Sequence, residues 1–283
     1  MPIVGVKCGY DESYQTFQSC IDCHQNGGPR NCHFPTFALK VMRDNDKKRK
    51  GAGYSATTVL ACPRAVALLE KYDYYEDLDS GWNKIRGELI HMAYEAEPDI
   101  LDGVIKEQRL RKWVTVDGQR IPITGKADEI NKTRAQIIDL KFTAAIPEQD
   151  KADHIAQFNI YAWLCSGGEF LFDDPTQNIK AGDILNLNIT GGGMHYISLK
   201  RKKKRDGRII PPWKKVAYPL WPSEQTERLI VSRLAPLVQF RQDGVLPACQ
   251  PYYTEPHWTC ECVKITQQLV ARGITITEEQ FHE

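Results

Sequence analysis

Two acidic residues and a lysine near the middle of the chain form a pattern that suits metal-assisted hydrolysis. Asp128 ends the segment Gly-Lys-Ala-Asp, and the segment Asp139-Leu140-Lys141 follows soon after it. Because side chains alternate along a strand, Asp139 and Lys141 share one face if the segment is extended. A divalent cation would relieve the repulsion between the two carboxylates, and the lysine would orient a water molecule or offset charge on a phosphate. The pattern favours hydrolysis of phosphodiester bonds, although a solvent-exposed ion pair has the same residue types.

Three further residues are spaced to join this group. His91 ends the segment Gly-Glu-Leu-Ile-His on an expected helix, where a neutral imidazole can bind a metal ion. Imidazole suits Mn²⁺ and later metals, whereas carboxylates suit Mg²⁺. Gln157 and Tyr161 have the i, i+4 spacing that places two residues on one face of a helix. Both can hydrogen-bond a phosphate or the lysine, although each of the three also fits an ordinary helix position.

The nine cysteines favour metal binding over a disulfide framework, because their number is odd and we expect a reducing compartment. Cys20 and Cys23 form a zinc-type knuckle, in which His24 or His33 could replace one thiolate ligand. Cys165 lies in an apolar helical stretch and is expected in the core. The other cysteines form an amino-terminal set and a set that brackets the rest of the chain: Cys8, Cys20, Cys23 and Cys32, and Cys62, Cys249, Cys260 and Cys262. The second set could also consist of unrelated buried thiols.

Hydrophobic patterns indicate the elements that must position these residues. The first expected helix begins after an N-cap at Ser55 or Thr57. Helices are expected over residues 55–69, 82–97, 148–165 and 223–242. Strands are expected over residues 106–116, 120–130, 135–142, 184–190 and 195–199, with turns at 131–134 and 191–193. The order helix, strands, helix, strands, helix predicts an α/β domain with a mixed sheet.

The first fifty residues differ from the rest of the chain. Residues 1–36 are rich in Gly, Asn, Gln and Cys and show no apolar period, so we expect a loop-like module that a structural Zn²⁺ holds together. Residues 43–50 are mostly charged and are interpreted as a basic linker. The predicted domains are therefore 1–50, the cysteine-rich module with its linker, and 51–283, which carries the acidic residues and the second cysteine set.

The net charge of the chain gives no argument for nucleic-acid binding, whereas a local cluster of basic residues does. Lys and Arg number 37 and Asp and Glu 36, for a net charge of +1, so any such argument rests on clustering. One basic run consists of Lys200, Arg201, Lys202, Lys203, Lys204 and Arg205. It could be a solvated hairpin tip or a clamp on a phosphate backbone, with Trp213 and Tyr218 stacking on unpaired bases. No groove-reading motif is visible, so we expect binding without sequence specificity.

Composition narrows the class of protein. Hydrophobic residues make up 42% and charged residues 26% of the 283 residues, which excludes a wholly disordered, collagenous or coiled-coil chain. No apolar run approaches the ~20 residues that cross a bilayer, and the first residues do not form a secretory signal. We therefore expect an intracellular, cytoplasmic protein with no membrane partner.

Four short motifs together resemble those of a known family. Gly-x-x-x-His, Gly-x-x-Asp, Asp-x-Lys and Gln-x-x-x-Tyr occur here in the order found in PD-(D/E)xK nucleases of the RecB-like branch. Residues 55–64 also resemble that branch, in which a cysteine before the nuclease core joins three near the carboxyl end to hold a 4Fe–4S cluster. CRISPR-associated adaptation nucleases and AddB-type helicase–nucleases share this layout. The resemblance spans residues 55–262. The chain departs from the family pattern at two points: Asp139 stands where Glu is common, and the carboxyl-terminal cysteine spacing, Cys-x10-Cys-x-Cys, is not the usual one.

The resemblance implies a restriction-endonuclease-like core, with a mixed central β-sheet flanked by helices. It implies that Lys141 is the catalytic lysine and that Gln157 and Tyr161 support DNA binding and the geometry of the active site. The implied ligands of Mg²⁺ or Mn²⁺ are His91, Asp128, Asp139 and the Leu140 carbonyl. The implied ligands of a 4Fe–4S cluster, or otherwise Zn²⁺, are Cys62, Cys249, Cys260 and Cys262.

The expected function is therefore that of a metal-dependent DNA nuclease. By resemblance, it would be an exonuclease on single-stranded DNA or DNA ends with a 5′→3′ preference. One alternative is a DNA-binding adaptor on a nuclease scaffold, with the amino-terminal knuckle as its protein-binding part. Another is a nuclease subunit that works only with a protein partner or as an oligomer, because helicase motifs are missing. Phage replication, repair and CRISPR spacer processing are all compatible with this function, and a viral or prokaryotic origin fits these pathways.

Overall fold

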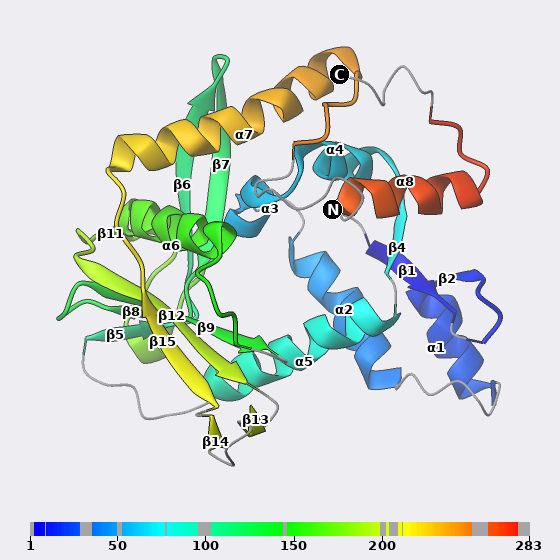
Figure 1. Ribbon diagram of the computed structural model, residues 1–283, viewed down its shortest axis with the longest axis horizontal. Helices are drawn as coiled ribbons and strands as arrows, with labels where there is room; N and C mark the ends of the chain where they lie inside the picture. The colour runs from blue at the N-terminus through cyan, green and yellow to red at the C-terminus, as the bar shows by residue number, and fades with distance from the viewer. Residues whose placement is uncertain are drawn as a thin grey trace.

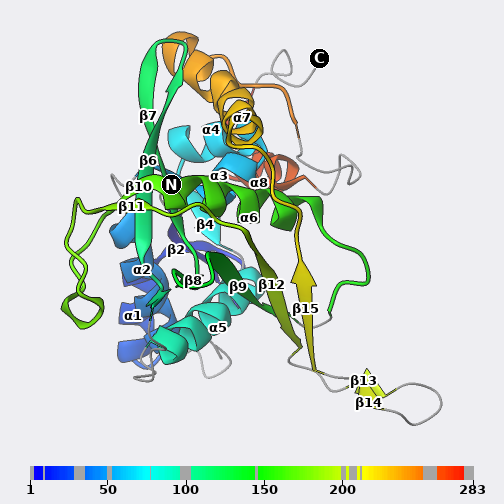
Figure 2. The same cartoon turned by 90° about the vertical axis from the view of Figure 1, so that its left-hand side faces the viewer.

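The computed structural model shows a mixed α/β protein, which confirms the fold class expected at this level (Figure 1, Figure 2). It describes residues 3–8, 10–28, 36–49, 53–76, 78–95, 103–143, 146–198, 202–203, 209–210, 212–250 and 260–276. Within these ranges, every helix is too short or too polar to cross a membrane.

The first of two five-stranded sheets contains a long hairpin. Its strands, in spatial order, are β11 (Ile184–Asn186), β10 (Ser166–Phe170), β6 (Arg109–Val116), β7 (Gln119–Lys126) and β3 (Tyr54–Ser55). β6 and β7 pair antiparallel along their whole length. Asp117 and Gly118 join them with φ values of 47° and 78°, as the tight turns typical of two-residue hairpins require.

The second five-stranded sheet carries the Asp-x-Lys segment on its central strand. Its order is β15 (Trp213–Ala217), β12 (Gly191–Ser198), β9 (Gln136–Thr143), β8 (Glu129–Asn131) and β5 (Val104–Lys106). β9 pairs parallel with β12 and antiparallel with β8. A separate two-stranded ribbon pairs β13 (Lys202–Lys203) with β14 (Ile209–Ile210).

The two sheets meet where the chain passes twice from one to the other. Glu107 lies between β5 and β6, and Asp128 lies between β7 and β8. The Glu107 N–H donates a hydrogen bond to the Asp128 carbonyl at 3.1 Å, so the two crossings are joined. This junction brings both carboxylates to the same place.

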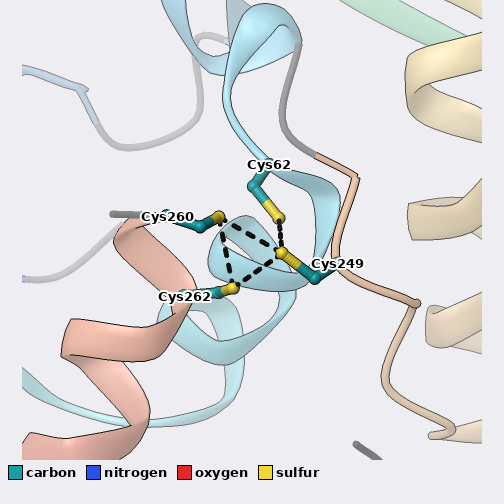
Figure 3. Close-up of side chains that lie close together, drawn as sticks. All are labelled: Cys62, Cys249, Cys260 and Cys262. Atoms are coloured by element: carbon teal, nitrogen blue, oxygen red, sulfur yellow. Dashed lines mark hydrogen bonds between the residues drawn. The ribbon is translucent and has the colours of Figure 1, made fainter. Parts of the chain in front are cut away.

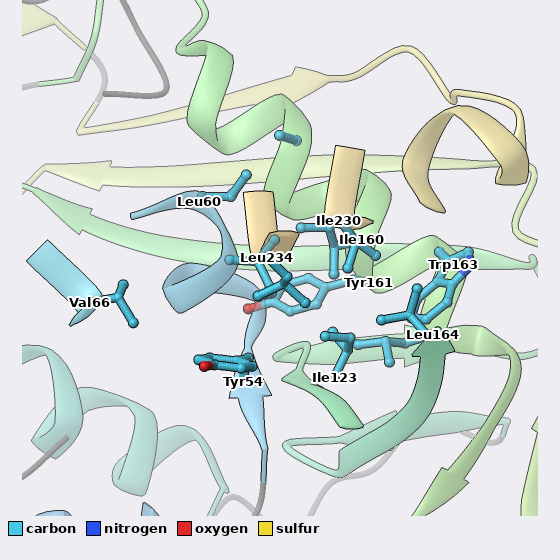
Figure 4. Packing of buried hydrophobic residues seen from close by; sticks show 14 of the residues in the cluster. Tyr54, Leu60, Val66, Ile123, Ile160, Tyr161, Trp163, Leu164, Ile230 and Leu234 are labelled. Atoms are coloured by element: carbon cyan, nitrogen blue, oxygen red, sulfur yellow. The ribbon is translucent and has the colours of Figure 1, made fainter. Parts of the chain in front are cut away.

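The main core lies between the sheets and a layer of helices. These are α3 (Ala56–Leu60), α4 (Pro63–Lys71), α6 (Ala152–Cys165), α7 (Ser223–Asp243) and α8 (Glu261–Ala271), and a 3₁₀ turn spans Pro175–Gln177. α6 packs against strands of both sheets, and α7 packs on α6 and β6. Figure 4 shows the centre of this core, where Ile160 and Leu164 of α6 lie near Ile123 of β7 and Ile230 of α7. Cys165 is fully buried here, as expected.

The amino-terminal residues form regular structure, and the expected loop-like module was wrong at this point. β1 (Ile3–Lys7) pairs with β2 (Tyr14–Thr16) and with β4 (Tyr74–Glu76). The helices here are α1 (Phe17–Gln25), α2 (Thr36–Arg49) and α5 (Leu78–Glu95). They surround a small apolar core of Val6, Phe17, Cys20, Ile21, Ala38, Leu39 and Ile85. The residues of this core are far apart in the sequence, so no local hydrophobic pattern predicts it.

The predicted domain boundary after residue 50 stays a prediction.

Three other local expectations need correction. Residues 43–49 of the expected basic linker belong to helix α2. The first turns of this helix contribute Ala38 and Leu39 to the small core. The helix expected from Ser55 is interrupted after Leu60, and a new helix begins at Pro63, because proline favours the first helical position. The glycines at 191–193 are strand and not turn: a Cβ on Gly193 would lie 1.8 Å from the Val216 carbonyl oxygen.

Candidate metal centres

An imidazole and two carboxylates meet at the junction of the sheets. His91, from the last turns of α5, has its Nδ1 atom 2.9 Å from Glu107 Oε1 and 3.2 Å from Asp128 Oδ1. One ligand atom from each of these residues lies within 4.8 Å of the others. Both carboxylates are buried, and the ring of Phe142 packs edge-on against the His91 ring. A nitrogen and two oxygen donors in this arrangement suit Mn²⁺ or Mg²⁺.

The sequence did not identify Glu107 as a member of this group. Its side chain is 0% exposed and forms an ion pair with Lys126. Its φ is 54°, a left-handed conformation that costs a non-glycine residue about 1–3 kcal/mol. A buried acid held in such a conformation points to a function at this position. Residues 104–110 read Val-Ile-Lys-Glu-Gln-Arg-Leu, and nothing in this polar stretch distinguishes the glutamate from its neighbours.

The Asp-x-Lys segment lies next to the three-residue group. Lys141 Nζ is 2.7 Å from Asp139 Oδ2, so the expectation that they share a face is confirmed. The Leu140 N–H between them donates to Asp128 Oδ2 at 2.5 Å. Since N–H and C=O of one strand residue point the same way, the Leu140 carbonyl also faces the Asp128 side. Asp139 itself pairs with Lys141 and does not belong to the three-residue group.

Gln157 and Tyr161 contact each other on α6, as their spacing predicts. Gln157 Nε2 donates to the Tyr161 hydroxyl oxygen at 2.6 Å, and both side chains are buried. Burial raises the pKa of Tyr161 well above its usual value, and the Asp139 carboxylate adds to this effect. The phenol therefore stays protonated and keeps a donor for a further partner.

The buried carboxylates of the His91, Glu107 and Asp128 group require a positive charge beside them. Burial raises the pKa of Asp128 to about 6, the Asp139 charge adds to the rise, and the His91 hydrogen bond opposes it. The hydrogen bonds to Asp128 and Glu107 raise the pKa of His91 to about 10. An imidazolium thus offsets the carboxylates at neutral pH. A metal ion that bound here would replace its proton.

Glycine at position 125 allows α6 to lie close to β7. A Cβ on Gly125 would come 2.5 Å from Leu164 Cδ1 and 2.9 Å from the Tyr161 ring. Gly125→Ala should therefore lower the free energy of unfolding by roughly 1–3 kcal/mol, measured by urea titration. The matched control is Gly87→Ala in α5, where the added Cβ meets nothing within 4 Å and should be neutral or stabilising by up to about 1 kcal/mol. Equal stability of the two variants would contradict this account of the packing.

Four cysteines from distant parts of the chain form a second centre (Figure 3). Cys62 immediately precedes α4, Cys249 follows α7, and Cys260 and Cys262 begin α8. Their sulfur atoms are 3.8 Å apart for Cys62–Cys249, 3.3 Å for Cys249–Cys260, 3.2 Å for Cys249–Cys262 and 3.3 Å for Cys260–Cys262. Three chain segments thus converge on one set of thiols, as expected of this set and not of scattered buried cysteines.

The surroundings of the thiols suit a bound metal centre. The hydrogen bond with Cys262 lowers the pKa of Cys62, whereas burial raises the pKa of Cys249 and the hydrogen bond with Cys62 raises the pKa of Cys262. Negative charge in the cluster therefore concentrates on Cys62. Zn–S bonds of ~2.3 Å place tetrahedral thiolates about 3.8 Å apart, close to the spacing seen here. Four cysteines are also the ligand set of a 4Fe–4S cluster, whose larger core requires the thiolates to lie farther apart. The donor set therefore suits either centre, and the observed sulfur spacing is that of a tetrahedral single-metal site.

Two arginines hold the segments that carry the thiols. Arg233 of α7 donates to the Ala61 carbonyl at 2.6 Å, next to Cys62. Arg64 donates to the Pro247 carbonyl at 3.2 Å, close to Cys249 in the chain. Both guanidinium groups are largely buried. These hydrogen bonds fix the cysteine-bearing loops.

The amino-terminal cysteines are placed differently. Cys20 belongs to the small apolar core, Cys23 is exposed and Cys8 is half-buried. Among the residues that the structure describes, these three form no compact ligand group. Cys32 and His33 lie outside the described residues, so the zinc site stays a prediction.

The basic run is only partly described. Lys202 and Lys203 form β13, while Lys200, Arg201, Lys204 and Arg205 lie outside the described residues. Trp213 is exposed and could stack on a base, but Tyr218 cannot: it is buried and its hydroxyl lies 2.7 Å from that of Tyr196. The clamp on phosphates stays a prediction.

Comparison with known proteins adds little to this geometry. No family model matches the chain, and no curated protein matches it. A solved structure described as "Crystal structure of SSO0001" is 19% identical, with a TM-score of 0.48, over 72% of this chain and 85% of that chain. The resemblance to PD-(D/E)xK nucleases stays a prediction.

Proposed function

We propose that this protein is a metal-dependent DNA nuclease of the PD-(D/E)xK type, with a restriction-endonuclease-like core of the RecB-like branch. One observation carries the proposal: His91, Glu107 and Asp128 converge on one point, and the Asp128–Leu140 hydrogen bond joins that point to the Asp139–Lys141 pair. Buried acids, an imidazole and a lysine at one place are the groups that phosphodiester hydrolysis requires.

Mg²⁺ or Mn²⁺ would be held by the imidazole and carboxylates of the three-residue group, with the Leu140 carbonyl facing the same side. When bound, such an ion lowers the pKa of water and offsets charge on a phosphate. Glu107 and Asp128 are poised to bind because each already accepts hydrogen bonds or an ion pair that fixes its direction. Fixed carboxylates lose little entropy when they bind a ligand.

Lys141 acts on the phosphate side of the site. Asp139 holds its ammonium group at 2.7 Å, so the side chain is oriented before the substrate arrives. The cation can then donate to the attacking water or to a phosphate oxygen whose charge increases in the transition state. Gln157 and the protonated Tyr161, buried on the neighbouring helix, support DNA binding through the geometry of the active site.

The four-cysteine centre has a structural role in this proposal. It joins the start of α4 to the segment after α7 and to the start of α8. A 4Fe–4S cluster is favoured over Zn²⁺ because of the resemblance in layout. Either centre would close the carboxyl-terminal part of the chain onto the nuclease core.

The role of Glu107 can be tested by metal binding alone. Glu107→Gln should weaken Mn²⁺ binding by at least ~10-fold, because it removes a ligand charge and even outer-shell partners of a metal site contribute 10–100-fold to affinity. Titration calorimetry with Mn²⁺ measures this without any DNA. The matched control is Glu129→Gln, whose carboxylate accepts a hydrogen bond from Tyr94 and should leave affinity unchanged. Equal loss in both variants would remove Glu107 from the site.

The type of cleavage can be tested on end-labelled DNA. We expect single-stranded DNA and duplexes with unpaired ends to be shortened from the 5′ end without sequence preference. A ladder of products that shortens progressively from one end shows an exonuclease, and its label shows the polarity. Internal fragments of fixed length, cut from a circular strand, would contradict an exonuclease and leave an endonuclease.

A further inference from the structure

The β6–β7 hairpin has one face that the main core does not use. Leu110, Val114 and Ile123 point toward the helices and are buried. Because side chains alternate along a strand, Trp113 lies on the opposite face, where it is 40% exposed. Figure 1 shows this hairpin running up past α7. A large aromatic residue therefore stands at the surface of a projecting two-stranded ribbon.

Two arginines lie against this tryptophan. The guanidinium carbon of Arg111 is 5.4 Å from the centre of the Trp113 ring, and that of Arg120 is 5.0 Å from it. Glu169 of β10 forms an ion pair with Arg111 at 2.6 Å. Arg120 is exposed, and no carboxylate among the described residues pairs with it. The face therefore combines an aromatic ring with positive charge that solvent can reach.

The strand register connects this face to the three-residue metal group, although Thr124, which lies on the face between them, is buried. At the other end of the ribbon, Arg109 pairs in register with Lys126, whose ammonium group contacts Glu107. Trp113 and Arg109 are four residues apart on β6, about 13 Å along a strand. That distance matches about four stacked nucleotides at ~3.4 Å each. A strand of nucleic acid lying on this face would reach the metal group after a few nucleotides.

We propose that the outer face of the β6–β7 ribbon binds the unpaired strand of the DNA substrate, with a base stacked on Trp113 and phosphates near Arg111 and Arg120. An arginine that leaves the ring for a phosphate frees a ring face for a base. Stacking on aromatic residues combined with basic side chains is how proteins hold single strands without reading sequence. The inference rests on the proposed nuclease function, because that function makes single-stranded DNA the substrate.

Binding of a fluorescent oligothymidine to the full chain in EDTA tests this, since cleavage is then excluded. Trp113→Ala should weaken binding roughly 5- to 100-fold, and Trp113→Phe should restore most of it because a ring remains. Arg120→Ala should lower the slope of log affinity against log salt by about 0.7, the value for one phosphate contact on a single strand. The matched controls are Tyr10→Ala, an exposed aromatic of the amino-terminal part, and Arg228→Ala, an exposed arginine of α7.

The outcomes separate this inference from the function on which it rests. Loss of affinity in Trp113→Ala alone, with the melting temperature unchanged and duplex binding little affected, supports the ribbon. Wild-type affinity in Trp113→Ala, or a loss no larger than in Tyr10→Ala, overturns the inference even if the protein cleaves DNA. If Trp113→Ala does not fold, the other two variants decide. Near wild-type affinity in Trp113→Phe with a lower salt slope in Arg120→Ala supports the ribbon, and a wild-type salt slope in Arg120→Ala overturns it. A wild-type protein that binds no oligothymidine overturns the ribbon, whereas one that binds through Trp113 but never cleaves overturns the nuclease proposal only.

Discussion

Lys141→Ala should lower kcat for DNA cleavage by about 10²–10³-fold at saturating Mg²⁺, the typical effect of removing one preorganised donor from a transition state. The ammonium group is held by Asp139 at 2.7 Å, so little reorganisation is needed when charge develops. The substrate affinity should change much less, because the lysine acts mainly in the transition state. Initial rates on end-labelled DNA, divided by the concentration of folded protein, measure the effect.

The effect on activity must be separated from an effect on folding. Asp139 is buried, and removing the partner of a buried charge costs about 3–5 kcal/mol. Lys141→Arg keeps the charge while changing the donor geometry, so it should fold like the wild type and remain slow. Lys132→Ala, in an exposed turn between β8 and β9, should cleave at the wild-type rate. Full activity in Lys141→Ala would contradict the role given to this lysine.

Cys62→Ser should cause the largest loss of stability of any single substitution considered. Loss of a metal centre is among the few changes that cost about 4–5 kcal/mol or more, which for a chain of this size lowers Tm by roughly 10 °C. The physical reason is that Cys62 is the one ligand from the amino-terminal side of the core, and the other three lie beyond α7. Anaerobic purification, elemental analysis and a thermal melt measure metal content and Tm together.

Cys165→Ala is the matched control for this substitution. It removes a buried sulfur that is 0% exposed and lies within the apolar core, and Cys165 does not belong to the four-cysteine group. It should lower stability by about 1 kcal/mol and leave metal content unchanged. Iron with charge-transfer absorption in the wild type supports the cluster, and zinc without colour supports a mononuclear site. Unchanged Tm and no metal in either protein would reject the centre.

The sequence predicted those parts of the site that depend on regular spacing. Strand alternation placed Asp139 and Lys141 on one face, and helical spacing brought Gln157 and Tyr161 into contact. These rules are local, so they hold whatever the rest of the chain does. The convergence of Cys62 with three cysteines near the carboxyl end was expected only from resemblance to a family, because no local rule relates residues so far apart.

The residues that the sequence missed depend on tertiary structure. Glu107 reaches the site because the chain crosses between two sheets with a positive φ at that residue, and no spacing rule marks such a junction. The amino-terminal strand β1 forms because β4, much later in the chain, pairs with it. Gly192 and Gly193 were expected in a turn, but close strand neighbours require glycine at that point in the sheet.

Metal-dependent cleavage of DNA tests the central claim most directly. The wild-type protein is incubated with end-labelled single- and double-stranded DNA in EDTA, in Mg²⁺ and in Mn²⁺, and binding to the same DNA is measured in parallel. The account predicts cleavage in Mg²⁺ or Mn²⁺ and none in EDTA, with Asp128→Asn and Lys141→Ala both defective under every condition. DNA binding without cleavage in either metal would contradict the account, and the protein would then be a DNA-binding adaptor or a subunit that needs its partner.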